Sequence, residues 1–134
     1  MKKFLLAMLL SASLLSLTGC ADSHDKAAAD FVAAVKEFND ALESVKDKVT
    51  AQGAKDKIVL LVEEMGAIKQ RMAELGNPTK EQKKVLQEKY LKLFNAEGKR
   101  FRDNLLRVEF QPELVHVLKD AMKKLADIRG IMAR

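Results

Sequence analysis

Apolar residues recur along much of the chain with the three- and four-residue spacing of one face of an α-helix. The first series predicts a helix that starts after Ser23, its N-cap, and ends near Gly53; it comprises Phe31, Val35, Phe38, Leu42, Val45 and Val49. A second series predicts a second helix; it comprises Ile58, Leu61, Met65, Ile68, Met72 and Leu75. Gly76 suits the position just after a helix, and Pro78 disfavours helix at Asn77, so we expect this helix to end there.

Two more helices are predicted in the second half of the chain. Thr79 and Gln82 have the spacing of a capping box, and the series that follows comprises Leu86, Tyr90, Phe94, Phe101, Leu105 and Val108. Glu97 and Gly98 stand where this series should have an apolar residue. Pro112 can open a fourth helix, because the first helical turn does not need its missing N–H. The apolar series of that helix comprises Leu114, Leu118, Ala121, Leu125, Ile128 and Met132.

Four helices joined by short links predict an all-α protein, an up-down-up-down four-helix bundle. The near seven-residue repeats of the first, second and fourth series favour shallow packing angles. The alternative is a long helical hairpin that buries its apolar stripes by forming a dimer. Composition agrees with the all-α class, because Ala, Leu, Lys and Glu are abundant and alternating β-branched runs are absent.

The first 19 residues have the pattern of an export signal. Lys2 and Lys3 give a positive start, and residues 4–17 form an uncharged, mostly apolar run of 14. A transmembrane anchor is the alternative, but a spanning helix needs about 20 apolar residues. The pattern therefore favours a signal peptide.

The end of this segment is more specific. Leu17, Thr18, Gly19 and Cys20 resemble the lipobox of bacterial lipoprotein precursors. The resemblance implies a lipoprotein signal peptide at residues 1–19, attachment of a lipid to the Cys20 sulfur, cleavage before Cys20, and acylation of its new amino group with a fatty acid such as palmitate. Residues 20–26 would then be a short tether and residues 27–134 the helical bundle domain. Cys20 is the only cysteine, so no disulfide can form within the chain.

The resemblance also implies a location. In lipoproteins of enteric-type bacteria, an Asp directly after the lipidated Cys favours retention in the inner membrane, and here that position is Ala21. We therefore expect the protein at the periplasmic face of the outer membrane, with the periplasmic side of the inner membrane as the alternative.

Charge is unevenly distributed. Loss of residues 1–19 removes two of the 24 basic residues and leaves 22 basic against 19 acidic side chains, a net charge of +3. Residues 22–78 carry 8 basic and 11 acidic side chains, whereas residues 79–134 carry 14 and 8. The basic half favours an acidic partner or anionic lipid, and the alternative is a solvated helix surface.

The sequence offers no pattern typical of catalysis. His24 lies in the expected tether and His116 lies off the apolar stripe, and neither has a partner spaced for a triad or a metal site. Glu63 and Glu64 are adjacent, so on a helix they do not face each other. We expect no enzyme activity, no metal and no cofactor. Export also argues against nucleic acid as a partner.

A candidate partner-binding site lies at the interruption of the third series. The basic residues that cluster there are Lys99, Arg100, Arg102 and Arg107. One interpretation is a notch lined by Tyr90 and Phe94, with a basic rim that contacts a partner protein. In the alternative, Glu97 pairs with a neighbouring cation and Gly98 accommodates an adjacent helix or breaks the helix in two.

These observations predict a non-enzymatic, lipid-anchored periplasmic lipoprotein that acts through protein–protein interaction, in an accessory, pilotin-like or inhibitory role. The architecture is similar to that of the helical pilotins, although those have a disulfide pair that this chain lacks. The alternative is a structural or stress-related envelope lipoprotein that contacts anionic lipid or cell wall. Salt should distinguish the two, because charge-based envelope binding weakens as ionic strength rises.

Overall fold

The computed structural model describes residues 23–132 and confirms the all-α class, since the chain forms no strand between those residues. The helices are α2 (His24–Ser44), α3 (Lys48–Glu74), α4 (Lys80–Glu109), α5 (Pro112–Val117) and α6 (Lys119–Met132). None of the described helices is long and apolar enough to cross a membrane. The expected signal peptide lies outside the described residues, as do Leu17, Thr18, Gly19 and the lipidation site Cys20.

The first helix boundary differs from the prediction. Helix α2 ends at Ser44, and α3 begins at Lys48 behind a capping box formed by Asp47 and Thr50, whose backbone N–H donates to Asp47 Oδ1 at 2.8 Å. The expected end near Gly53 is therefore wrong. The apolar spacing continued across the link by coincidence, and Val49 is 76% exposed at the start of α3.

Other local predictions hold. Thr79 and Gln82 form the expected capping box of α4. Gly76 has a φ of 71°, the left-handed conformation that suits the residue after a helix.

Three further predictions about the helices are wrong. Helix α4 is continuous over 30 residues, so the proposed break at Gly98 does not occur. The expected fourth helix is instead divided at Leu118 into α5 and α6. Helix α2 starts at His24, so residues 24–26 of the expected tether are helical.

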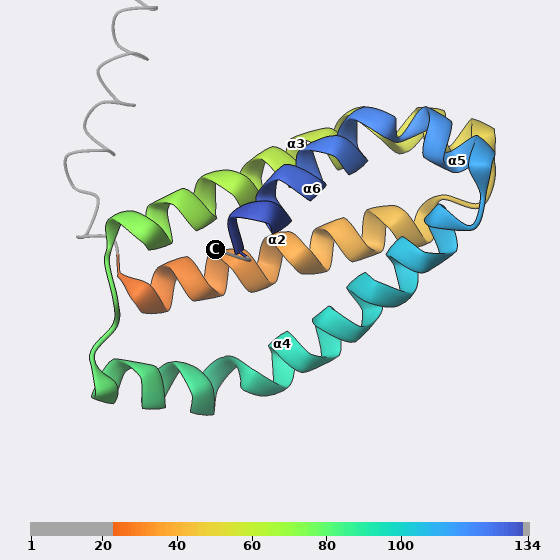
Figure 1. Ribbon diagram of the computed structural model, residues 1–134. Coiled ribbons are helices and arrows are strands. Elements are labelled where there is room, and N and C mark those ends of the chain that lie inside the picture. Colours follow the sequence, from red (N-terminus) through yellow and green to blue (C-terminus); the bar gives the residue numbers. More distant parts are fainter. Residues whose placement is uncertain (1–22, 133–134) are drawn as a thin grey trace, which may run out of the picture.

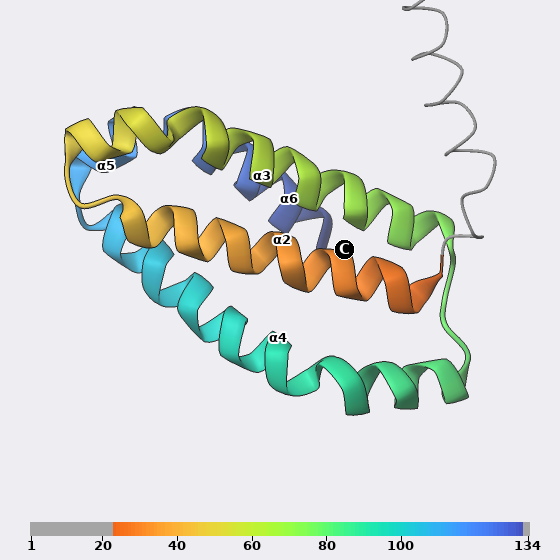
Figure 2. The same cartoon turned by 180° about the vertical axis from the view of Figure 1, so that it is seen from behind.

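The helices run back and forth along one axis, but consecutive helices are not always neighbours (Figures 1 and 2). Helix α2 packs between α3 and α4, and α6 packs against α3. The chain passes from α3 to α4 across the start of α2, where His24 Nε2 lies 3.0 Å from the Gly76 carbonyl oxygen. The five-residue link can reach about 17 Å, which is enough to cross one helix of about 10 Å diameter.

The core is concentrated near the end of the molecule where α5 lies. Residues with almost no exposed side chain include Phe38, Leu42, Val45, Ile58, Val62, Val108, Leu114 and Leu118. The first half of α4 contributes only Tyr90 to the buried set, and it exposes Val85, Leu91 and Leu93. One half of α4 is therefore packed as a core helix, while the other presents apolar side chains to solvent.

Candidate functional site

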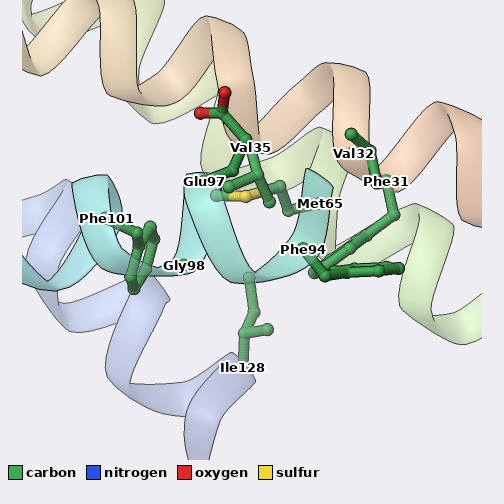
Figure 3. A pocket seen from close by; sticks show the side chains of 9 residues that line it. All are labelled: Phe31, Val32, Val35, Met65, Phe94, Glu97, Gly98, Phe101 and Ile128. Atoms are coloured by element: carbon green, nitrogen blue, oxygen red, sulfur yellow. The ribbon is translucent and has the colours of Figure 1, made fainter. Parts of the chain in front are cut away.

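A largely apolar groove of about 190 Å³ lies on the side of the molecule where α4 faces α6. We call it the apolar groove. Its lining residues come from α2, α3, α4 and α6, as Figure 3 shows: Phe31, Val32, Val35, Met65, Phe94, Glu97, Gly98, Phe101 and Ile128. Glu97 is the only charged residue among them, so the groove suits an apolar ligand surface.

The groove exists because α4 and α6 do not close against each other. Over the described residues, no Cα atom of α4 lies within 8 Å of one in α6. A second hollow of about 260 Å³, the inner pocket, continues the same gap toward α5; its lining residues are Leu105, Glu109, Val115, Met122, Leu125 and Ala126. We call the whole gap, with the apolar groove and the inner pocket, the α4/α6 seam.

Gly98 keeps part of the groove open. A Cβ atom added at Gly98 would have nothing within 4 Å, so no neighbouring helix requires a glycine at this position. The expectation that Gly98 accommodates an adjacent helix is therefore wrong. Between Phe94 and Phe101 this face of α4 has no large apolar side chain, and the missing volume is the hollow of the groove.

Two aromatic pairs hold α4 against α2 at the groove. The ring centroids of Phe38 and Phe101 lie 5.4 Å apart, and those of Phe31 and Phe94 lie 6.1 Å apart, both in tilted arrangements that aromatic rings favour. Phe38 is completely buried, whereas Phe94 is 37% exposed. The first pair therefore belongs to the core, and the second forms an apolar wall that solvent can reach.

Glu97, the charged residue of the groove, is held by contacts within the chain. The Glu97 carboxylate accepts hydrogen bonds from Asn39 Nδ2 at 2.9 Å and from Arg100 Nη1 at 2.8 Å. Pairing of Glu97 with a neighbouring cation, one of the two sequence interpretations, is thus confirmed. In Figure 3 the carboxylate points away from Ile128. The floor of the groove accordingly presents hydrocarbon to a ligand.

Arg100 joins α4 to α2. Its guanidinium donates to Asp40 Oδ1 at 2.7 Å and to both carboxylate oxygens of Glu43, at 2.9 and 3.0 Å. These hydrogen bonds lower the pKa of Asp40 and the pKa of Glu43, and they raise the pKa of Arg100. Arg100 therefore stabilises the packing of the two helices that carry the groove.

Arg107 also binds its own chain. Its guanidinium donates to the carbonyl oxygen of Val45 at 2.6 Å and to that of Leu42. These carbonyls lie at the C-terminal end of α2, where the Leu42 carbonyl also accepts from the Val45 N–H and where a positive charge is favourable. Lys99 and Arg102 lie exposed on α4. Of the four basic residues singled out from the sequence, these two present their charge to solvent.

Tyr90 does not line the groove, whereas Phe94 does. Tyr90 is 6% exposed, and its hydroxyl lies 3.1 Å from Asp25 Oδ1 in the first turn of α2. Lys89 pairs with the same carboxylate at 2.9 Å, and this hydrogen bond lowers the pKa of Asp25. Tyr90 thus fixes α4 to the start of α2.

Six groove residues were assigned by sequence to the helix stripes or not singled out: Phe31, Val32, Val35, Met65, Phe101 and Ile128. The apolar spacing gave the only available signal, and it could not distinguish a closed core from an open groove.

His116 is exposed on α5. Between residues 23 and 132, no group of His, Cys, Asp or Glu side chains is arranged to hold a metal ion.

Comparisons with protein families, with curated proteins and with solved structures found no match for this chain.

Proposed function

We propose that this protein is a lipid-anchored envelope lipoprotein that binds an amphipathic helix of a partner protein in the α4/α6 seam and catalyses no reaction. The anchor rests on the resemblance of Leu17, Thr18, Gly19 and Cys20 to a lipobox. The same resemblance, with Ala21 after the cysteine, supports the periplasmic face of the outer membrane, and the inner membrane is the alternative.

The open seam is the observation that carries the binding function. We propose an up-down-up-down bundle that works as a monomer with one side unclosed, in place of the hairpin dimer. Phe94 and, three positions before it, Leu91 leave apolar surface exposed there, with Leu91 54% exposed. Burying such surface yields about 25 cal/mol per Å². A partner helix packed between α4 and α6 would bury this apolar surface and contact both helices.

The shape of the seam favours a helix over a compact ligand. The apolar groove and the inner pocket follow one another along α4, from Phe94 to Glu109. At 1.5 Å per residue these 15 steps span about 22 Å. A partner helix with apolar side chains repeated about every seven residues could fill both hollows at once, as in other helix-in-groove complexes.

A second function, contact with anionic lipid or cell wall, is favoured by one observation. Lys80, Lys83 and Lys84 are exposed in the first turns of α4, at the same end of the molecule as Ser23, where the tether would enter (Figure 1). A charge-based contact of this kind should fade as salt rises, because the screening length falls from about 10 Å at 0.1 M to about 3 Å at 1 M. Helix docking in an apolar seam should persist.

The binding function can be tested in the natural host by photo-crosslinking. A photoreactive phenylalanine analogue at Phe94 should yield an adduct whose partner peptide, identified by mass spectrometry, has a helical apolar repeat. The same analogue at the exposed Ala96, on another face of α4, is the control.

Substitution in the groove completes this test. Gly98→Phe should abolish the adduct by filling the groove, whereas Ala96→Phe should leave it unchanged. An adduct with lipid or with a second copy of the chain, or an adduct insensitive to Gly98→Phe, would refute helix docking in the seam.

A further inference from the structure

We propose that the helix bound in the α4/α6 seam is acidic, with carboxylates along both edges of its apolar stripe. This inference rests on the proposed docking function and adds the chemistry of the partner. It comes from the charged side chains that stand beside the lining residues on both sides of the seam.

On the α4 side, Arg102 stands at the rim. It follows Gly98 of the apolar groove by four residues and precedes Leu105 of the inner pocket by three, so these residues are neighbours on the helix surface. Its other neighbours at these spacings are Lys99 and Leu106. No acidic residue of α4 is therefore spaced to neutralise Arg102, which is exposed.

On the α6 side, Lys119 has the same relation to the seam. It is exposed, and it lies three residues before Met122 and four after Val115, which both line the inner pocket. Its remaining neighbours at these spacings are His116 and Lys123. A cation with no acidic neighbour at helical spacing thus stands on each side of the apolar gap.

The carboxylates near the seam do not cancel these cations. Glu97 of the apolar groove already binds Asn39 and Arg100. Asp120, next in sequence to Lys119, pairs with Lys55 of α3 at 3.9 Å. Glu109 is the remaining acidic lining residue, and it is exposed in the inner pocket. A docked helix would therefore meet one cation on each flank against this single carboxylate, a balance that favours Asp or Glu beside its apolar stripe over Lys or Arg.

Two designed peptides test the inference. Each is a helix of about 20 residues, long enough to span the seam, with leucines in a seven-residue repeat and with flanking positions that are all Glu in one peptide and all Lys in the other. Binding is measured by fluorescence anisotropy to the protein as its host processes it, held in nanodiscs of zwitterionic lipid so that neither detergent nor anionic lipid competes.

The Glu peptide should bind about tenfold more tightly than the Lys peptide at low salt, because several exposed ion pairs of modest strength add to the apolar contact. The double variant Arg102→Glu, Lys119→Glu should remove this preference. Lys92→Glu, a charge reversal at an exposed α4 position that lines neither hollow, should retain it. Equal binding of the two peptides, or tighter binding of the Lys peptide, would overturn the inference.

The Gly98→Phe variant separates the two proposals. If both peptides bind equally and Gly98→Phe blocks both, helix docking stands and the acidic partner does not. If neither peptide binds, or if binding is unchanged by Gly98→Phe, helix docking fails and the inference fails with it.

Discussion

At the scale of single residues, the first prediction concerns Gly98, a glycine inside α4 that lines the apolar groove. Glycine in a helix interior destabilises by roughly 0.5–1 kcal/mol relative to alanine, and an added methyl group at Gly98 would meet nothing within 4 Å. Gly98→Ala should therefore raise the free energy of unfolding by about that amount, measured by urea denaturation. Gly53→Ala in α3, where a Cβ is equally unhindered, is the matched control. A loss of stability at Gly98 alone would show that the glycine is structurally required.

Arg100 makes stability depend on pH through Asp40 and Glu43. Both carboxyl groups have a lowered pKa in the folded protein because they accept hydrogen bonds from Arg100. Their contribution is present above their unfolded pKa values, about 4, and is lost as pH falls through the folded values.

Arg100→Gln should therefore be less stable than the natural protein at neutral pH, and the difference should shrink below about pH 4. Urea denaturation across the acid range measures both proteins. A difference that stays constant from neutral to acid pH would contradict the role assigned to Arg100.

Single residues were predictable from sequence where the chemistry was local. Glu97 pairs with Arg100, as the interpretation with a neighbouring cation predicted, because Arg100 lies three positions away on the same helix. In one of the two interpretations Tyr90 and Phe94 line the same notch, and of these two residues only Phe94 lines the groove. Tyr90 lies away from the groove because its hydroxyl contacts Asp25, which is 65 residues earlier in the sequence. The apolar spacing within one helix cannot predict a contact between residues so far apart in the sequence.

At the scale of elements, Arg107 links the end of one helix to another. Its guanidinium donates to the carbonyl of Val45, the residue just after the last turn of α2, and to the carbonyl of Leu42, which also accepts from the Val45 N–H. Arg107→Met keeps much of the apolar stem and removes the donors, so it should lower the free energy of unfolding by about 2 kcal/mol. Urea denaturation gives the value, and Arg102→Met, at an exposed α4 position, is the control. Equal effects of the two substitutions would contradict a capping role.

Helix α4 should show two levels of stability along its length. Residues 104–108 include three buried side chains, whereas residues 80–93 bury only Tyr90 and expose Val85, Leu91 and Leu93. Few buried apolar contacts lower the free energy of local opening. Hydrogen exchange followed by mass spectrometry should therefore show faster exchange in residues 80–93 than in residues 104–108. Uniform protection along α4 would mean that its first half is packed as firmly as its second.

Helix boundaries were predictable where a specific cap marks them. Thr79 and Gly76 gave correct boundaries because each has a local reason, a side-chain cap or a left-handed backbone. The boundary between α2 and α3 was missed because Asp47 and Thr50 form their capping box inside a region of continuous apolar spacing. The apolar spacing alone predicts one continuous helix there, whereas the capping box starts a new helix.

At the scale of the whole molecule, the order of the helices around the bundle was not predictable from their faces. Apolar spacing shows which side of a helix is buried and does not show which neighbour covers it. The short link after Gly76 suggested that α3 and α4 are neighbours, but the chain crosses the start of α2 instead. The α4/α6 seam follows from this order, so the groove could not be derived from the stripes that line it.

The proposed lipid anchor gives the prediction that concerns the whole molecule and its location. One acyl chain gives only marginal membrane binding, and two or more make the attachment stable at about 0.8 kcal/mol for each buried CH₂ group. If Cys20 carries such chains, the natural protein should remain in the membrane fraction after a high-salt wash, because salt screens charges but leaves hydrocarbon burial intact. Cys20→Ala should move the protein out of that fraction, while Arg102→Glu, which alters only surface charge, should not. Retention of Cys20→Ala after the same wash would mean that another part of the chain holds it at the membrane, and mass spectrometry of an unmodified cysteine on native material would refute the anchor directly.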